Sequence, residues 1–312
     1  MSPTPNPHRH VLGDWGTTRL RLFLIEGDRV ASQCEGPGIA SLVASPPQIL
    51  TQLVAPWRRP EDRLDVYLAG MVGSRNGWHE VPYLPLPTDC AAWCNAAWTT
   101  SVDGITVRIA GGLCMKPQNG AGDVMRGEEA QIFGALRADP ALARGTRILV
   151  LPGTHSKWVQ LIDGVITRFR TAFTGETYAL FRDYSTLLRA SATSDGAEDF
   201  ALGFAAGSRR ARELDEGVLA AVFEARTAQL LQGRSRAWAA GFLSGLLIAH
   251  EIDTLGNAYG AKAGVTIIGD PQLTEFYRQI LEERACPAHV LAGDACVIEG
   301  LRYLAACARQ SR

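Results

Sequence analysis

The sequence predicts an α/β protein built from two similar halves. Its 312 residues suggest about two domains at roughly 150 residues each. Hydrophobic residues make up 46% of the chain and charged residues 20%, which is enough apolar material for conventional cores and excludes a disordered chain. Two segments of the same strand, glycine-turn and hairpin plan indicate that the halves arose by duplication.

The first of these segments lies near the N-terminus. Residues 11–17 read as a strand that ends in a Gly-Thr turn. Alternating leucines at 20–24 predict an antiparallel partner strand, and residues 26–27 predict the turn into a third short strand at 29–32. The pattern is therefore a strand, a glycine turn and a hairpin.

The second segment repeats this order. A strand at 148–151 leads to Gly153, and two further short strands flank an Asp-Gly dipeptide that ends at Gly164 and strongly favours a hairpin. Gly153 follows Gly16 by 137 positions, and Gly164 follows Gly27 by the same 137. Such dipeptides are common enough to recur by chance, but the shared strand context favours duplication.

Two such halves would face each other across a cleft, where ligands prefer to bind. Main-chain N–H groups of a Gly-Thr turn can cradle phosphate oxygens, so residues 16–17 and 153–154 predict a paired polyphosphate site. Asp14 has Leu151 as its counterpart, so only the first half offers a carboxylate for Mg²⁺. Lys157 is a candidate phosphate ligand. The alternatives are that Asp14 caps its own turn and that Lys157 points to solvent.

A third glycine element lies near the C-terminus. Residues 265–268 read as a buried strand, Gly269 interrupts it, Asp270 is a good helix N-cap and Pro271 suits the first helical position. Apolar residues at helical spacing from position 273 onward predict an amphipathic helix. The combination could form a nucleotide shelf, although a plain strand-to-helix connection would have the same pattern.

The candidate catalytic stretch is Gly-Ala-Gly-Asp-Val-Met-Arg-Gly-Glu-Glu at residues 120–129, after a predicted strand at 105–109. A glycine-rich loop is expected to deliver Asp123 to the start of a helix. A carboxylate held there could accept the proton of an attacking hydroxyl, as phosphoryl transfer requires. The alternative is that Asp123 is only an N-cap.

Residues 69–78 set polar side chains between glycines after a predicted strand at 64–68. Arg75 offers two parallel donors for a carboxylate, and Ser74, Asn76 and Trp78 could bind hydroxyls or wall a pocket. A surface loop with Trp78 tucked into the core is the alternative interpretation.

Overall charge and segment lengths exclude several classes. The 31 basic residues nearly cancel the 32 acidic ones, so no general attraction to nucleic acid or a membrane is expected. The apolar stretch 238–249 is too short for a membrane span and predicts a buried helix. Seven cysteines without a CxxC pair predict free thiols. The start, residues 1–10, resembles neither a signal peptide nor a helix-turn-helix, so a cytoplasmic protein without a DNA-binding module is expected.

Five motifs in this order resemble the 2-keto-3-deoxygalactonate kinase family: Asp14-Trp-Gly-Thr-Thr18, Gly70-Met-Val-Gly-Ser-Arg-Asn-Gly-Trp78, Asp123-Val-Met-Arg-Gly-Glu-Glu129, Leu151-Pro-Gly-Thr-His-Ser-Lys-Trp158 and Thr174-Gly-Glu176. The resemblance implies two ribonuclease-H-like α/β domains of the actin/hexokinase/Hsp70 ATPase fold with an interdomain cleft. The domains would span 1–145 and 146–312, with the last helix, about 296–312, packing back on the first.

The resemblance also implies a kinase that uses ATP and Mg²⁺ to phosphorylate the 6-hydroxyl of 2-dehydro-3-deoxy-D-galactonate. Asp14 would hold the metal, Asp123 would be the general base, and Arg75 or Arg126 would bind the substrate carboxylate beside Ser74, Asn76 and Trp78. Nucleotide contacts would come from Gly16, Thr17, Thr18, Gly153, Thr154, His155, Ser156, Lys157, Gly269 and Asp270.

Three alternatives stay open. A kinase of the same fold could act on another sugar acid such as 2-dehydro-3-deoxygluconate, and a nucleotide switch or exopolyphosphatase is compatible with the fold alone. The expected partner is a small sugar acid, with no nucleic acid and no membrane. The oligomeric state is left open, a homodimer included.

Overall fold

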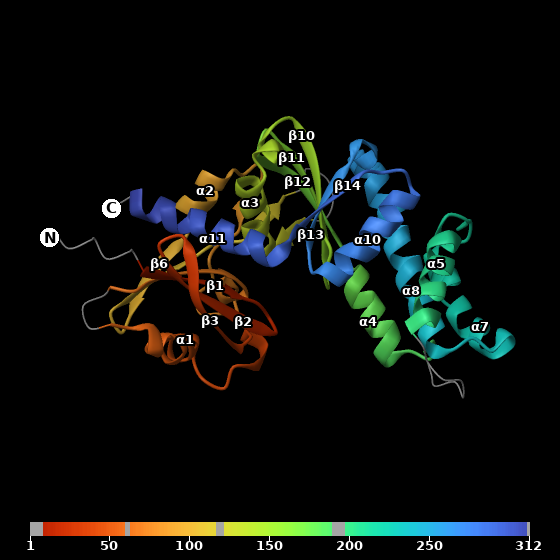
Figure 1. Cartoon of the computed structure of the whole chain (residues 1–312), viewed down its shortest axis with the longest axis horizontal. Coiled ribbons are helices and arrows are strands. Elements are labelled where there is room, and N and C mark those ends of the chain that lie inside the picture. The colour runs from red at the N-terminus through yellow and green to blue at the C-terminus, as the bar shows by residue number, and fades with distance from the viewer. Residues whose placement is uncertain (1–8, 60–62, 117–121, 189–196, 311–312) are drawn as a thin grey trace. The chain divides into compact units, whose positions relative to one another are not determined.

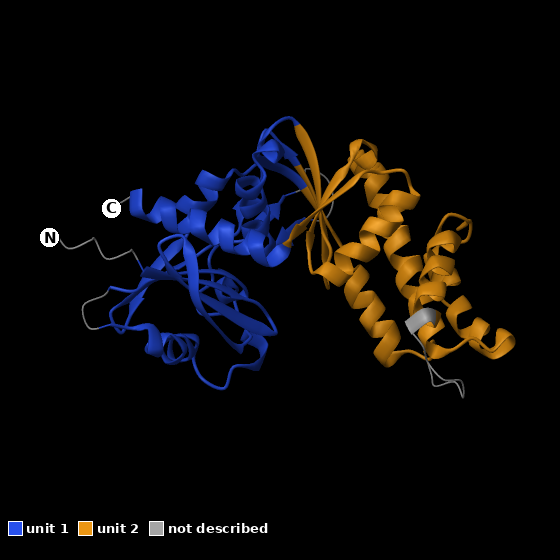
Figure 2. Ribbon diagram, viewed as in Figure 1, with its two compact units in different colours: residues 1–145, 161–168, 293–312 blue, residues 146–160, 169–292 orange. Residues whose placement is uncertain are grey.

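The computed structural model describes residues 9–59, 63–116, 122–188 and 197–310 (Figure 1). The chain forms two compact units (Figure 2). Unit 1 comprises residues 1–145, 161–168 and 293–312, and unit 2 comprises residues 146–160 and 169–292.

The main sheet of unit 1 has six strands in the order β3-β2-β1-β4-β7-β6. β1 pairs antiparallel with β2 and parallel with β4, and β4 pairs parallel with β7. The carboxyl ends of β1, β4 and β7 therefore meet at one edge of the sheet. The strands are β1 (Arg9–Trp15), β2 (Arg19–Glu26), β3 (Arg29–Pro37), β4 (Asp65–Gly70), β6 (Trp98–Val102) and β7 (Ile105–Ile109).

A second, three-stranded sheet and four helices complete unit 1. The small sheet has the order β5-β8-β9. Helix α1 packs beside β3, whereas α11 contacts α3, α2, β1 and β4. The elements are β5 (Leu84–Pro85), β8 (Leu113–Met115), β9 (Asp123–Met125), α1 (Pro46–Val54), α2 (Cys90–Asn95), α3 (Glu128–Ala138) and α11 (Gly293–Gln310).

The sheet of the second half has five strands in the order β12-β11-β10-β13-β14, which matches β3-β2-β1-β4-β7 strand for strand. β13 again lies parallel to β10, as β4 does to β1. The turn glycines Gly27 and Gly164 both have positive φ, 61° and 79°. The α/β class with two ribonuclease-H-like sheets is confirmed, and the shared strand order is the one that the predicted duplication requires. The strands are β10 (Thr146–Leu151), β11 (Ser156–Ile162), β12 (Val165–Ala172), β13 (Val265–Gly269) and β14 (Ala288–Ala292).

Helices cover the rest of unit 2, and two of them confirm specific predictions. The 238–249 stretch lies in α8, most of whose residues are buried. Asp270 caps α10 by accepting hydrogen bonds from the N–H groups of Gln272 (2.9 Å) and Leu273 (3.3 Å). The helices are α4 (Thr174–Tyr184), α5 (Ala197–Ala211), α6 (Val218–Ala221), α7 (Glu224–Gln232), α8 (Arg236–Glu251), α9 (Asn257–Tyr259) and α10 (Pro271–Glu283), with a π-helical turn at Ile252–Gly256.

Each unit has its own hydrophobic core. In unit 1 the core joins the inner faces of β1, β2, β4 and β7 to α1. In unit 2 it joins β10 and β13 to α8 and α10. All seven cysteines are free, as predicted. Within the described ranges, none of the helices has the length and apolar character needed to cross a membrane.

One prediction about local structure is wrong. Asp123 does not lie at the start of a helix: it belongs to strand β9, where it pairs with Met115 of β8. Helix α3 begins only at Glu128, because Gly127 adopts a φ of 110° and turns the chain between strand and helix. Residues 120 and 121 of the predicted glycine-rich loop lie outside the described residues.

Helices α5 and α8 approach so closely that glycine is required on both. A Cβ added to Gly241 would lie 2.1 Å from the carbonyl oxygen of Phe200, and one added to Gly203 would lie 2.0 Å from that of Trp238. Gly207 and Gly245 repeat the pattern one turn further along. Small residues thus let the two backbones touch.

We expect Gly241→Ala to lower the free energy of unfolding by about 1–3 kcal/mol, because the methyl group must push the helices apart. Gly203→Ala should have a similar effect from the facing helix. Urea or thermal unfolding measures both. If both variants are as stable as the parent, the close approach of α5 and α8 is wrong.

Candidate functional site

The first group of predicted site residues gathers at the carboxyl edge of the unit 1 sheet. Asp14, near the end of β1, is paired in register with Ala69 of β4. The next residue of β4, Gly70, has a φ of 101°, and a Cβ there would lie 2.7 Å from the carbonyl oxygen of Trp15 and 3.4 Å from Oδ1 of Asp14. The parallel pairing therefore brings the Asp14 motif and the residue 70–78 motif side by side.

Asp14 is not a turn cap. Its Oδ2 accepts a hydrogen bond of 2.7 Å from Nη2 of Arg21 on β2, and the Arg21 guanidinium also bonds Asp294 at the start of α11. Burial acts to lower the pKa of Arg21, but the hydrogen bonds and attraction of the two carboxylates raise it on balance. One strand residue thus holds two carboxylates together.

This arrangement fits the chemistry of a Mg²⁺ ion, which prefers oxygen ligands and is usually held by one or two carboxylates together with phosphates. Arg21 bonds Oδ2 of Asp14, so Oδ1 is the oxygen left to coordinate a cation. The Asp14 side chain is 25% exposed, which gives a cation access from solvent.

The turn after Asp14 is exposed and is held through its carbonyl groups. The carbonyl oxygens of Gly16 and Thr17 accept from the N–H groups of Ile39 and Ala40, both at 3.0 Å. Thr17 and Thr18 lie on the surface. The turn therefore has a fixed backbone with its two hydroxyl-bearing residues turned outward.

The loop after β4 separates its polar residues into buried and exposed ones. Ser74 is buried, whereas Arg75 and Asn76 are exposed. The N–H of Trp78 donates to the carbonyl oxygen of Val72 at 2.8 Å, and the Trp78 ring packs partly buried against the core of unit 1. Both sequence interpretations of Trp78, a core residue and a pocket wall, are compatible with this position.

Arg126 lies against this loop. Its Nη2 donates to the carbonyl oxygen of Val81 at 2.9 Å, and its guanidinium carbon lies 4.2 Å from the centre of the Tyr83 ring. A Cβ on Gly73 would lie 3.0 Å from Nη1 of Arg126. The predicted residues Ser74 and Arg126 are therefore brought together by the tertiary structure, although 52 positions of sequence separate them.

Glu129, in the first turn of α3, is fully buried and anchors the turn between β9 and the helix. Both of its carboxyl oxygens lie within hydrogen-bond distance of the Gly127 N–H, at 2.9 and 2.7 Å. Burial, with repulsion from Glu128, raises the pKa of Glu129 to about 8. The group therefore titrates near neutral pH.

In unit 2, the predicted phosphate turn is docked on the start of α4. The N–H of Glu176 donates to the carbonyl oxygen of Thr154 at 2.9 Å, and a Cβ on Gly175 would lie 2.2 Å from the carbonyl oxygen of Gly153. His155 interacts with the Glu176 carboxylate at 2.5 Å. The turn therefore packs directly on the Thr174-Gly-Glu176 motif.

Lys157 does not point to solvent, contrary to the alternative drawn from the sequence. The residue is 3% exposed, and its Nζ donates to the carbonyl oxygen of His155 at 2.8 Å. The ammonium group therefore lies against the same turn whose amides are proposed to meet a phosphate.

A buried carboxylate beneath the turn links three elements. Glu251, at the end of α8, accepts from Nε1 of Trp158 and from the hydroxyl of Tyr277, both at 2.8 Å. The Tyr277 hydroxyl also lies 2.9 Å from Oγ of Ser156. Burial raises the pKa of Glu251, while hydrogen bonds from Thr174, Trp158, Tyr277 and Ser156 oppose the shift.

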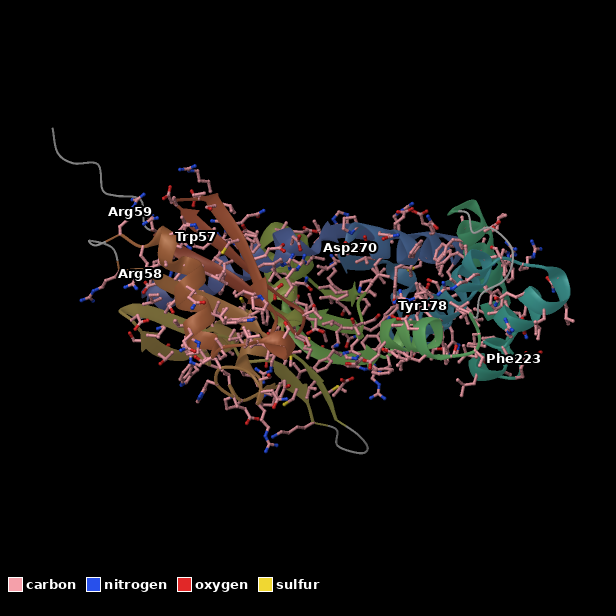
Figure 3. The ribbon with its side chains drawn as sticks, turned by 90° about the horizontal axis from the view of Figure 1, so that it is seen from below. Trp57, Arg58, Arg59, Tyr178, Phe223 and Asp270 are labelled. Atoms are coloured by element: carbon pink, nitrogen blue, oxygen red, sulfur yellow. The ribbon has the colours of Figure 1, made fainter. Side chains whose placement is uncertain are left out.

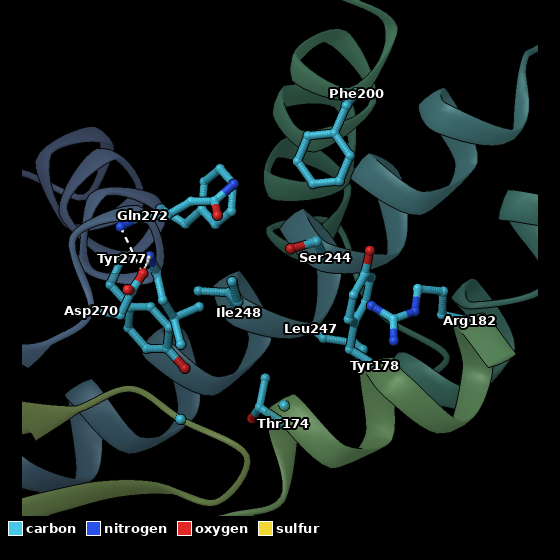
Figure 4. A pocket seen from close by; sticks show the side chains of 14 residues that line it. Thr174, Tyr178, Arg182, Phe200, Ser244, Leu247, Ile248, Asp270, Gln272 and Tyr277 are labelled. Atoms are coloured by element: carbon cyan, nitrogen blue, oxygen red, sulfur yellow. Dashed lines mark hydrogen bonds between the residues drawn. The ribbon is translucent and has the colours of Figure 1, made fainter. Parts of the chain in front are cut away.

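The turn opens into a cavity of about 310 Å³ that lies wholly within unit 2 (Figure 4). Gly153 and Thr174 line one part of it, and Asp270 lines another at the start of α10. Figure 3 shows Asp270 and Tyr178 in unit 2, on α10's N-terminal side and on α4. Apolar and polar side chains complete the walls: Tyr178, Arg182, Phe200, Ser244, Leu247, Ile248, Gln272, Leu273, Phe276 and Tyr277.

Several residues of these sites escaped the sequence analysis. Arg21 and Asp294 are far apart in sequence, and no motif around either residue indicates that it belongs to a site. Glu251 is the last residue of a largely apolar helix, and a single acidic residue there is a signal that sequence analysis can use, because an uncompensated carboxylate is costly to bury. Phe276 is predicted only as part of an amphipathic helix.

We expect the stability difference between Glu129→Gln and the parent to depend on pH. The raised pKa means that folded Glu129 stays protonated between its usual value of 4.5 and about 8, whereas the unfolded chain ionises. The parent's stability should therefore fall as pH rises through this window, and the variant should lack that component. Urea unfolding at pH 5 to 9 measures it, and a constant difference would contradict the assignment.

We expect Glu251→Ala to lower the free energy of unfolding by about 2–5 kcal/mol, because the Trp158 N–H loses its acceptor and a cavity remains. Glu251→Gln, which keeps one acceptor oxygen, should cost less. Glu275→Ala is the matched control: it removes an exposed carboxylate paired with Arg278 and should cost no more than about 1 kcal/mol. Equal losses at Glu251 and Glu275 would argue against the buried network.

Comparison with known proteins identifies the family. Residues 14–304 match the family described as 2-keto-3-deoxy-galactonokinase. The chain is 34% identical over 299 residues to the 2-dehydro-3-deoxygalactonokinase of Escherichia coli K12, covering 95% of this chain and 97% of that one. A relative from Rhizobium meliloti strain 1021, provisionally named for the same activity, is 32% identical over 291 residues, covering 92% and 94%.

The fold is shared with a solved structure. A crystal structure of a candidate 2-dehydro-3-deoxygalactonokinase from Sinorhizobium meliloti has a TM-score of 0.85 with this chain at 31% identity, covering 96% of this chain and 98% of the other. The five motifs that suggested the resemblance all fall within or overlap the matched region. The chain is therefore a member of the 2-keto-3-deoxy-galactonokinase family and a phosphotransferase with an alcohol group as acceptor.

Proposed function

We propose that the enzyme transfers the γ-phosphoryl group of ATP to the 6-hydroxyl of 2-dehydro-3-deoxy-D-galactonate in the cytoplasm. The proposed ATP site is based on the cavity of unit 2. Gly153 of the glycine turn and Asp270 at the capped start of α10 both line this cavity. Its volume lies at the lower end of ordinary ligand pockets, and its walls mix apolar and aromatic side chains with a few polar ones.

The nucleotide would run from this cavity along the turn. The adenosine would lie near Gly269 and Asp270, and the phosphates would meet the amides of Gly153 and Thr154 together with His155, Ser156 and Lys157. The buried position of Lys157 supports this role, because an ammonium held against the turn adds fixed positive charge. Gly16, Thr17 and Thr18 of unit 1 would also contact nucleotide phosphates.

Unit 1 would supply the ligand of the metal ion and the binding site of the acceptor. Asp14 would coordinate Mg²⁺, which when bound neutralises phosphate charge during transfer. Ser74, Arg75, Asn76, Trp78 and Arg126 would bind the sugar acid. Asp123 would orient the acceptor hydroxyl and take its proton. The placement of the last helix on the first domain is supported by the grouping of α11 with unit 1, whereas residues 161–168, which the proposed division 1–145 and 146–312 gives to the second domain, also group with unit 1.

A coupled assay of ADP release across sugar acids tests the substrate. We expect the highest kcat/KM with 2-dehydro-3-deoxy-D-galactonate, a lower one with 2-dehydro-3-deoxygluconate, and phosphate on carbon 6 of the product by NMR. ATP hydrolysis without any acid would instead support a nucleotide switch or phosphatase. A preference for the gluconate epimer would overturn the assigned substrate but not the kinase chemistry.

We expect Asp123→Asn to lower kcat by about 10²–10⁴-fold, the usual contribution of a general base, while the affinity for ATP stays within about twofold. Asp139→Asn, at an exposed cap on the far end of α3, is the control and should be unchanged. Turnover and ATP titration are measured separately. Near-normal turnover of Asp123→Asn would remove this residue from the mechanism.

A further inference from the structure

Two predicted acceptor residues of unit 1 carry buried polar atoms without hydrogen-bond partners. Among the described residues, Oγ of Ser74 has none, and neither have Nε and Nη1 of Arg126. Ser74 is only 8% exposed. A buried donor that bonds neither protein nor water is costly, and a guanidinium more so, because its charge requires compensation.

The two groups belong to one place. The Gly73 backbone, which precedes Ser74, lies close enough to Arg126 that a Cβ on Gly73 would meet Nη1 at 3.0 Å. The guanidinium is held on two further sides, by the Val81 carbonyl oxygen at Nη2 and by the face of Tyr83. These contacts fix the position of the guanidinium cation. They use only some of its hydrogen-bond donors.

Local charges compensate Arg126 only in part. Attraction to Arg126 acts to lower the pKa of the buried Glu129, but the Glu129 carboxyl group hydrogen-bonds the Gly127 N–H and not the guanidinium. No ion pair of Arg126 is present among the described residues, whereas Arg21, on the same edge of the sheet, pairs with two carboxylates. One oxygen of Glu128 accepts from the main-chain N–H of Arg126 at 3.1 Å. The Arg126 side chain is thus left available to an anion from outside the protein.

We propose that Arg126 and Ser74 form the carboxylate site of the acceptor, with Arg126 neutralising the acid and Ser74 donating to one of its oxygens or to the adjacent keto oxygen. This inference rests on the proposed sugar-acid kinase function and assigns the carboxylate to Arg126 instead of the exposed Arg75. It makes a terminal carboxylate the feature by which the enzyme separates sugar acids from neutral sugars.

The first test uses Arg126→Met, with Arg137→Met, an exposed residue of α3 paired with Glu299 of α11, as the matched control. The probes are 2-dehydro-3-deoxy-D-galactonate and its uncharged carboxamide. We expect Arg126→Met to raise KM for the acid roughly 10- to 100-fold, leave KM for ATP unchanged, and abolish the preference for acid over carboxamide. Arg137→Met, which loses a surface pair with Glu299, should keep that preference. Retention of the preference in Arg126→Met, or its loss in Arg75→Met alone, overturns the proposal.

The second test uses Ser74→Ala, whose effects on stability and binding should have opposite signs. Removing a buried hydroxyl that has no partner should leave the unfolding temperature of the ligand-free enzyme unchanged or higher. The same change should raise KM for the acid severalfold. A purely structural serine would show a lower unfolding temperature with unchanged KM, and that result contradicts the proposal.

Direct calorimetric titration of the acid, without ATP, separates this proposal from the proposed function. If the parent binds the acid and Arg126→Met does not, the carboxylate site stands even when no phosphoryl transfer occurs. If the parent phosphorylates the acid but Arg126→Met binds it equally well, the kinase function stands and the carboxylate site is wrong.

Discussion

The parallel pairing of β1 with β4 is the constraint on which the acceptor side depends. Parallel strands end at the same edge of a sheet, so this single pairing brings the Asp14 motif beside the loop that carries Ser74. Gly70 makes the contact possible because it accepts a positive φ and has no Cβ to strike Trp15. A shift of one residue in this register would turn Asp14 to the opposite face of the sheet.

Buried polar groups near the two candidate sites differ in whether they have hydrogen-bond partners. Glu251 is surrounded by donors, which hold the phosphate turn, α8 and α10 in one arrangement. Ser74 and Arg126 keep donors that bond no protein group among the described residues. A complete network specifies a rigid scaffold, whereas unsatisfied donors fixed in position are suited to a ligand that completes them. The complete network thus lies beneath the turn at Gly153, and the donors without protein partners lie at the loop that carries Ser74.

Duplication explains why the two sheets share one strand order. Divergence explains why the residues at their strand ends differ. The two sheets share one strand order, yet Asp14 of the first corresponds to Leu151 of the second, which is buried. The first copy keeps a carboxylate near a solvent-accessible edge, paired with Arg21. The second has an apolar strand end and instead builds a cavity from α4, α8 and α10. Equivalent strand ends thus serve different chemistry.

The sequence by itself determined the two-sheet α/β class, the repeated hairpins, the buried helix α8 and the Asp270 cap of α10. These features depend on contacts between near neighbours, on hydrophobic periodicity and on turn residues, all of which are local. It also marked most candidate site residues, because polar side chains between glycines are uncommon as packing material. It misplaced Asp123, since the choice between β9 and the first turn of α3 depends on pairing with β8.

Only the tertiary structure decided which of the marked residues are buried, paired or left with free donors. Arg75 and Arg126 are equivalent in sequence terms, but one is exposed and the other is fixed against Gly73 and Tyr83. Arg21 joins Asp14 to Asp294 across 280 positions of chain, and Glu251 meets Trp158 and Tyr277 only because three elements converge. Such contacts are set by how strands and helices pack, which no local pattern encodes.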